Sequence, residues 1–318
     1  MREGNTRGRV MRFLLFLLII LIVIPVNASI VVTISDFKPI VKAITGDKLE
    51  VVSLLPAGSD PHHFSLSGKD IELLKNADLI VLTNSELFGF ERKIKEKFKN
   101  VLDFEDYGVE LEDFPGYPKN PHGYWLKPEN CIAIAKAVKE RLSLLYPEYR
   151  DYFEENFVEF IKRVKEAEAE ANRIAKDVRG KNFVAAVPGV CYIASSLGVN
   201  VSAVLFSESY GFLSGKELEK IRGKLKSGEY VGIIIPEFMK GSKVGEVVEQ
   251  LSRDTGCRVA YVRFSMGDVS YETALISNAA RIAYSQTKRS SGNDEYLYVL
   301  SAICLLEAGA LLFIGVRK

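Results

Sequence analysis

The sequence has few of the residues that would mark a disulfide scaffold or a nucleic-acid surface. Its cysteines, Cys131, Cys191, Cys257 and Cys304, show no CxxC spacing. This argues against a zinc ribbon or a redox motif; one disulfide remains open, but the sequence does not pair it. The formal net charge is only +1, with basic residues spread among the acids. No basic stripe indicates a nucleic-acid partner, so we expect none.

Motifs of the common enzyme classes are also missing. The chain has no GxSxG elbow, no GxGxxG after a strand, no Walker loop and no HExxH. These absences argue against the usual hydrolases, dinucleotide enzymes and metalloproteases, so we expect a protein that is not an enzyme. The enzyme alternative is a metal-dependent hydrolase. It would need a general base beside an open coordination position, and Glu237 is the one candidate for that base.

What is present is ordinary globular composition, with 318 residues, 47% of them hydrophobic and 26% charged. This length suits about two domains. Both ends of the chain are apolar. Residues 13–26 follow four arginines and precede small residues, which predicts a signal peptide over 1–28, with an uncleaved anchor as the alternative. Residues 297–316 are long enough to span a bilayer.

The two ends together predict a location for the body of the protein. The basic pair that closes the chain fits a cytoplasmic tip, with the body on the extracytoplasmic side of the cell membrane. We therefore expect a single transmembrane anchor over 296–318. A polar, turn-rich tether over 286–295 would join it to the body.

Between these ends, apolar strand-like runs alternate with helical patterns. The first group reads SIVVTIS, LEVVSLLP, ADLIVLTN and NVLDF, and the second reads KNFVAAVP, VNVSAVLF, YVGIIIPE and CRVAYVRF. Near-continuous apolar strands separated by helices are typical of parallel sheets covered on both faces. The sequence therefore predicts an α/β fold of two lobes, over residues 29–146 and 181–285.

A long helical pattern connects the two lobes. Apolar residues recur at three- and four-residue spacing through residues 147–180, with Pro147 at the start and Gly180 at the expected end. Such a helix would span roughly 45 Å at 1.5 Å per residue. That length is enough to link both lobes, although a surface helix within one lobe remains the alternative.

Candidate ligands lie in loops after predicted strands, where open α/β sheets bind their ligands. His62 and His63 follow LEVVSLLP, and His122 lies in KNPHGYWLKPEN. Imidazoles suit zinc and neighbouring transition metals, and carboxylates complete such sites or favour manganese. The second lobe offers Glu208, Glu237 and Asp268 at the ends of its strands. Each acid also has an ordinary alternative as a solvated loop residue.

Several motifs together resemble the zinc and manganese solute-binding proteins of ABC transporters. DPHHF and the following ADLIVLTN are similar to that family's DPHxYEP and ADLVxxNG, and NPHGYWLKPEN resembles its DPHxWLDPxN. VGIIIPEFMKGSKVGEVVEQLSRDTGCRV and YETALISNAARIA resemble its later motifs. The resemblance covers about residues 29–285. It implies a receptor that captures a divalent metal ion between two lobes for a membrane permease with its ATPase.

Carried over by position, the resemblance implies His62 and His122 as ligands. The family's third ligand falls on Val187 and its fourth near Met266, neither of which offers an oxygen or nitrogen donor. We therefore expect Glu237 and Asp268 to complete the site, with His63 and Glu208 as alternates. Lys127 replaces the family's aspartate and would add positive charge nearby. The alternative function is a membrane-tethered receptor or adhesion-like module that has lost metal binding or binds another solute.

Overall fold

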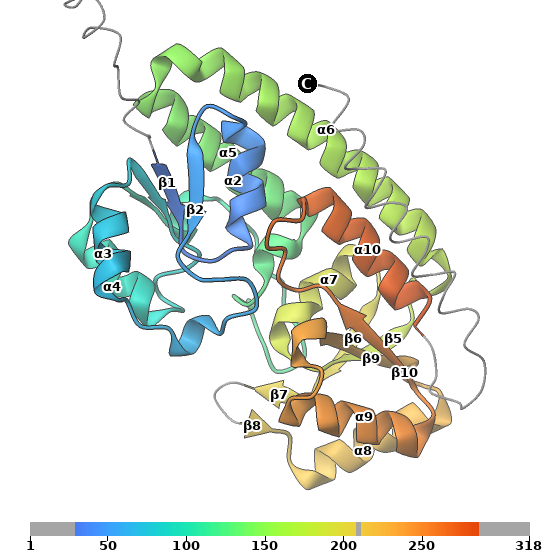
Figure 1. Ribbon diagram of the computed structural model, residues 1–318. Helices are drawn as coiled ribbons and strands as arrows, with labels where there is room; N and C mark the ends of the chain where they lie inside the picture. The colour runs from blue at the N-terminus through green and yellow to red at the C-terminus, as the bar shows by residue number, and fades with distance from the viewer. Residues whose placement is uncertain (1–28, 208–210, 286–318) are drawn as a thin grey trace, which may run out of the picture.

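The computed structural model describes residues 29–207 and 211–285 (Figure 1). The predicted signal (1–28), tether (286–295) and anchor (296–318) lie outside the described residues, as does Glu208. Within the part that is described, no helix is both long and apolar enough to cross a membrane. Cys131, Cys191 and Cys257 are buried free thiols.

The first lobe is built on a parallel sheet of four strands in the order β2-β1-β3-β4. Its strands are β1 (Ser29–Val32), β2 (Glu50–Ser53), β3 (Leu79–Val81) and β4 (Val101–Leu102). Its helices are α2 (Phe37–Thr45), α3 (Gly68–Lys75), α4 (Gly89–Lys97) and α5 (Pro128–Leu145). Ser67 and Asp70 form the capping box that begins α3, and Pro128 is the first residue of α5.

The second lobe repeats this plan with strand order β10-β9-β5-β6. Its parallel strands are β5 (Asn182–Ala185), β6 (Asn200–Val204), β9 (Gly232–Pro236) and β10 (Arg258–Val262). Its helices are α7 (Cys191–Ser196), α8 (Gly215–Ser227), α9 (Lys243–Thr255) and α10 (Tyr271–Ala283). A short antiparallel pair, β7 (Phe206–Ser207) and β8 (Gly211–Phe212), extends from this lobe. The two-lobed α/β prediction is confirmed.

The predicted linking helix is also confirmed. A 3-10 turn over Pro147–Tyr149 leads into α6 (Arg150–Ile174), and a second turn over Ala175–Asp177 follows. Figure 1 shows α6 running past both sheets, and it packs against α2 and α5 of the first lobe and α10 of the second. The helix therefore bridges the lobes.

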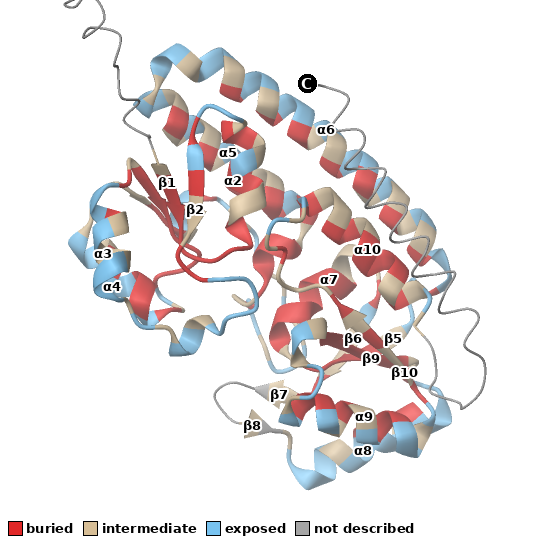
Figure 2. Ribbon diagram, in the orientation of Figure 1, coloured by how far each residue is buried: buried red, intermediate tan, exposed pale blue. Residues whose placement is uncertain are grey.

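Strand periodicity explains how the core is divided. Ile30 and Val32 of β1 face a large core that is shared by both lobes and α6, whereas Val31 faces a separate core of the first lobe. In β5, Ala185 faces the shared core and Val184 a separate core of the second lobe. Side chains alternate between the two faces of a strand, so each sheet is buried on both sides (Figure 2). This holds the loops after the strands on a rigid base.

Candidate metal site

A single 3-10 turn after β2 carries the paired histidines of the first lobe. The turn spans Pro61–His63, and the Oδ1 atom of Asp60 accepts a hydrogen bond from the backbone N–H of His62 at 2.9 Å. Since such a turn has three residues per turn, consecutive side chains point in directions about 120° apart. The imidazoles of His62 and His63 therefore point in different directions.

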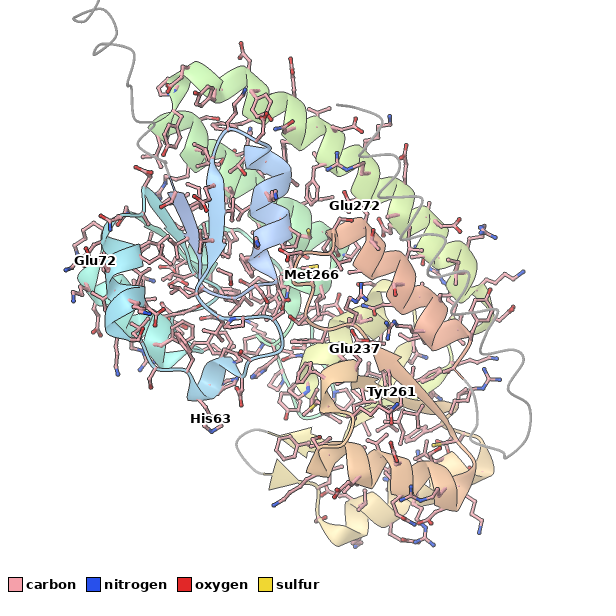
Figure 3. The ribbon with its side chains drawn as sticks, viewed as in Figure 1. His63, Glu72, Glu237, Tyr261, Met266 and Glu272 are labelled. Atoms are coloured by element: carbon pink, nitrogen blue, oxygen red, sulfur yellow. The ribbon has the colours of Figure 1, made fainter. Side chains whose placement is uncertain are left out.

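The contacts of the two rings differ accordingly. The rings of His62 and Phe88 pack in a T-shaped arrangement, with 4.9 Å between ring centroids. The Nδ1 atom of His63 lies 2.8 Å from Oδ2 of Asp60, and its side chain is 87% exposed. Figure 3 shows His63 at the lower edge of the first lobe, away from Met266 and Glu237. The alternate ligand His63 thus faces solvent.

His122 is placed by a second, more buried loop. The backbone of Gly123 has φ 75°, which favours glycine, and the chain then enters a 3-10 turn over Tyr124–Leu126. Tyr124 is fully buried, and its hydroxyl donates to the carbonyl oxygen of Thr83 at 2.6 Å. Before the histidine, Asn120 accepts from the backbone N–H of His122 at 3.0 Å. His122 therefore lies between two residues, Asn120 and Tyr124, that hydrogen bonds hold in place.

The structure brings His62 and His122 together. Their ring centroids lie 6.0 Å apart with 33° between the ring planes. Tyr117 flanks His122, edge to face, at 6.2 Å between centroids. Imidazole nitrogens brought together from separate loops are ligands that suit zinc and neighbouring transition metals.

The predicted acids of the second lobe do not join them. Oε2 of Glu237 lies 2.8 Å from Arg281, and its Oε1 lies 3.5 Å from Arg263. Oδ1 of Asp268 lies 2.7 Å from Nζ of Lys38, and this hydrogen bond lowers the pKa of the aspartate. Both carboxylates are thus held by cations. Among residues 29–207 and 211–285, no three histidine, cysteine or acidic residues are grouped to hold a metal ion.

Glu208 lies outside the described residues, but the strand just before it is placed. The hydroxyl of Tyr117 donates to the carbonyl oxygen of Phe206 in β7 at 3.4 Å. Tyr117 also contacts the ring of His122. The start of the β7–β8 pair is therefore tied to the loop that carries His122, a link that the sequence did not indicate.

Comparisons with known proteins decide the family. A family model described as "ZnuA: Zinc-uptake complex component A periplasmic" matches residues 30–284. The chain belongs to this family.

Individual relatives of the ZnuA family are distant. The manganese ABC transporter substrate-binding lipoprotein PsaA of Streptococcus pneumoniae is 28% identical over 187 residues, which is 54% of this chain and 59% of PsaA. A putative metal-binding protein of Thermotoga maritima is 27% identical over 244 residues, 76% of this chain and 86% of that protein. The SBP FpvC from Pseudomonas aeruginosa, solved with Mn2+, has TM-score 0.67 and 22% identity, covering 81% of this chain and 97% of FpvC. This last likeness shows the fold.

Three departures from the motifs of the ZnuA family have a structural setting. Val187, at the expected third-ligand position, packs against the shared core, and Met266, near the fourth, is 2% exposed within it. Lys127, expected to add charge near the site, instead pairs with Glu112 at 2.8 Å, which raises the pKa of the lysine. The lost donors are replaced by apolar packing, while the extra cation is neutralised locally.

Proposed function

We propose that the protein is the extracytoplasmic solute-binding component of an ABC transporter and binds a divalent metal ion, zinc or manganese, for uptake. The observation that carries this proposal is the 6.0 Å separation of the His62 and His122 rings. Family membership over residues 30–284 supports the transport role, in which a permease and its ATPase are the partners. A binding role without catalysis also agrees with the absence of the common enzyme motifs.

The two imidazoles leave coordination positions to be filled. Zinc in proteins usually has four ligands, some of which can be carboxylate oxygens or water. We propose Glu208 as the third ligand, because Phe206, two residues earlier, is hydrogen-bonded to Tyr117 beside His122. Glu237 and Asp268 are weaker candidates, since a metal ion would have to displace arginine or lysine from them.

Thermal unfolding with and without metal tests the binding proposal. A ligand that binds only the folded protein stabilises it by RT ln(1 + [L]/Kd), about 2.7 kcal/mol at a hundredfold excess over Kd. We expect zinc or manganese to raise the melting temperature of the wild-type protein, and His62→Ala or His122→Ala to remove the rise. His63→Ala is the matched control and should keep it.

The opposite result has a defined meaning. If neither metal shifts the wild-type melting temperature at concentrations well above micromolar, the metal proposal fails. The favoured function is then the tethered module of the same fold that has lost metal binding.

Paired carboxylate variants test the third ligand. Glu208→Gln removes the charge that we assign to the metal, whereas Glu237→Gln removes a charge held by Arg281 and Arg263. We expect titration calorimetry to show weaker metal binding for Glu208→Gln and near wild-type affinity for Glu237→Gln. The reverse order would move the carboxylate ligand to Glu237.

We also propose that residues 1–28 direct export and that residues 296–318 anchor the protein in the cell membrane, with the body outside. The support is the sequence alone: two apolar segments with basic flanks. The full chain should stay with membranes through alkaline carbonate extraction, whereas a chain ending at Ser285 should be released. Release of both proteins would show that residues 296–318 do not anchor the chain.

A further inference from the structure

We propose that Asn120 is a positioning residue, which fixes the tautomer of His122 and ties that imidazole to the second lobe. This inference rests on the proposed function for its consequence in metal binding, but its geometry stands by itself. Asn120 is fully buried, at 0% exposure, in a loop that otherwise faces the surface at Pro118 and Lys119. A buried amide in such a loop must find partners for its polar atoms, and each partner constrains the local structure.

Two backbone groups determine which way the amide of Asn120 faces. Its Oδ1 atom lies 3.0 Å from the backbone nitrogen of His122, which can only donate. Its Nδ2 atom lies 2.9 Å from the carbonyl oxygen of Pro188, which can only accept. Reversing the amide would place donor against donor and acceptor against acceptor. The orientation is therefore set by its surroundings.

The same oxygen then determines the state of the imidazole. Nδ1 of His122 lies 3.0 Å from Oδ1 of Asn120. Since this oxygen accepts, Nδ1 must carry the hydrogen, and in the neutral ring the lone pair is left on Nε2. A histidine that binds metal through one nitrogen commonly donates from the other to a fixed acceptor, which holds the ring in place. Asn120 supplies that acceptor here.

The other half of the amide reaches across to the second lobe. Pro188 begins the 3-10 turn Pro188–Val190, directly after Val187. The main-chain carbonyl oxygen of Asn120 also accepts from the hydroxyl of Tyr192 in α7 at 2.7 Å. Although Val187 offers no side-chain ligand, its neighbour Pro188 contacts the site indirectly through Asn120 and His122. Through Pro188 and Asn120 the second lobe therefore constrains the imidazole, although Val187 itself supplies no ligand.

These contacts explain why position 120 is asparagine, whereas the family's motif DPHxWLDPxN begins with aspartate. A carboxylate at position 120 would still accept from His122, but it has no hydrogen to donate to the Pro188 carbonyl. Two oxygen atoms would then face each other in a buried place. Asparagine, unlike aspartate, can both accept from His122 in the first lobe and donate to Pro188 in the second.

Nitrogen-15 NMR of the imidazoles in the metal-free protein tests the inference directly. We expect His122 of the wild-type protein to be protonated at Nδ1 in its neutral form. Asn120→Asp should keep this tautomer, whereas Asn120→Ala should shift it toward protonation at Nε2. Asp60→Asn is the control: it alters the partner of His63 and should leave the signals of His122 unchanged. Wild-type His122 protonated at Nε2 would overturn the proposal even if no variant folds.

Amide hydrogen exchange tests the link to the second lobe. Asn120→Asp loses the donor to Pro188, so exchange at residues 189–192 should become faster while the tautomer of His122 is kept. Unchanged exchange there would show that the amide does not tie the two lobes.

Metal titration connects the inference to function and separates the two proposals. Asn120→Ala should weaken zinc binding by about 10- to 100-fold, the usual effect of removing a partner of a ligating histidine. Wild-type affinity in Asn120→Ala would contradict the positioning role. If the wild-type protein binds neither zinc nor manganese yet shows the Nδ1 tautomer, the proposed function fails while the assignment of Asn120 stands.

Discussion

At the scale of single residues, Asp36 is a buried carboxyl group at the contact between the lobes. It follows β1 of the first lobe, is 4% exposed, and its Oδ1 atom accepts from the backbone N–H of Met266 in the second lobe at 2.7 Å. Burial raises its pKa from 3.8 to about 6, although hydrogen bonds from Met266 and Ser265 oppose the rise. Glu91, fully buried in the first lobe, has its pKa raised to about 7 for the same reason.

These raised pKa values predict how stability depends on pH. Between about pH 4 and 6 the folded protein keeps a proton on Asp36 that the unfolded chain has released. The free energy of unfolding therefore falls as pH rises through this window, by about 3 kcal/mol for a shift of this size. Asp36→Asn should remove that part of the fall, while Glu91 keeps its own contribution up to about pH 7.

Urea unfolding at several pH values between 4 and 7 measures the effect. The decisive quantity is the difference in slope between wild type and Asp36→Asn, since the absolute stability also changes with the lost hydrogen bonds. Parallel curves would show that Asp36 titrates near its ordinary pKa.

The candidate site shows which residues a sequence can identify. His62 and His122 were predicted from motifs, and the structure places their rings together. The surroundings of the two acids were harder to predict. Glu237 is held by Arg281, 44 positions away, and Asp268 is held by Lys38, 230 positions away. Such partners cannot be read from local spacing. Asn120 was missed, although its place before Pro121 and His122 was the available signal.

At the scale of elements, α6 is a helix with one face in the shared core and one in water. Its buried residues recur at three- and four-residue intervals: Phe153, Phe157, Phe160, Val164, Ala167 and Ala171. Figure 2 shows the resulting alternation of buried and exposed bands along the helix. The buried face contacts helices of both lobes, so it sets how the lobes sit relative to each other.

A matched pair of α6 variants tests this role. Phe160 is 1% exposed and Val158, two positions earlier, is 58% exposed. Phe160→Ala should lower the free energy of unfolding by about 3–5 kcal/mol, because it leaves a cavity in the shared core. Val158→Ala should change it by less than about 0.5 kcal/mol. Chemical denaturation measures both, and equal effects would contradict the assignment of the two faces.

Periodicity predicted the elements well where the pattern was long or strongly apolar. The parallel strands and α6 were all found from the sequence, because burial on both sheet faces and the helical repeat leave clear patterns. The pair β7 (Phe206–Ser207) and β8 (Gly211–Phe212) was not predicted. Strands of two residues are too short to show alternation, and their position depends on contacts such as that between Tyr117 and Phe206.

At the scale of the whole molecule, the lobes are in close contact near His122. A Cβ atom added to Gly123 in the first lobe would lie 2.3 Å from the carbonyl oxygen of Gly189 in the second. The hydroxyl of Tyr271 in α10 donates to the carbonyl oxygen of Leu126 at 2.8 Å. Backbone therefore approaches backbone across the lobes, which requires glycine at position 123.

Two glycine variants separate this contact from ordinary backbone strain. Gly123 and Gly116 have similar φ values, 75° and 79°, but an added Cβ at Gly116 meets nothing within 4 Å. Gly116→Ala should cost about 1–2 kcal/mol for its left-handed conformation. Gly123→Ala should cost about 1–3 kcal/mol more, the usual penalty of overpacking, because the lobes must shift to admit a methyl group. Equal losses in thermal or chemical unfolding would show that the lobes are not in contact there.

We propose that one metal ion binds between His62 and His122, and zinc K-edge X-ray absorption of the zinc-loaded protein counts the imidazole nitrogens that hold it. We expect two imidazole nitrogens in the coordination shell of the wild-type protein and of His63→Ala. His62→Ala and His122→Ala should each leave one imidazole nitrogen in the coordination shell of any zinc that remains bound. An imidazole count that is unchanged by these two substitutions, or a wild-type protein that binds neither zinc nor manganese, would contradict this proposal.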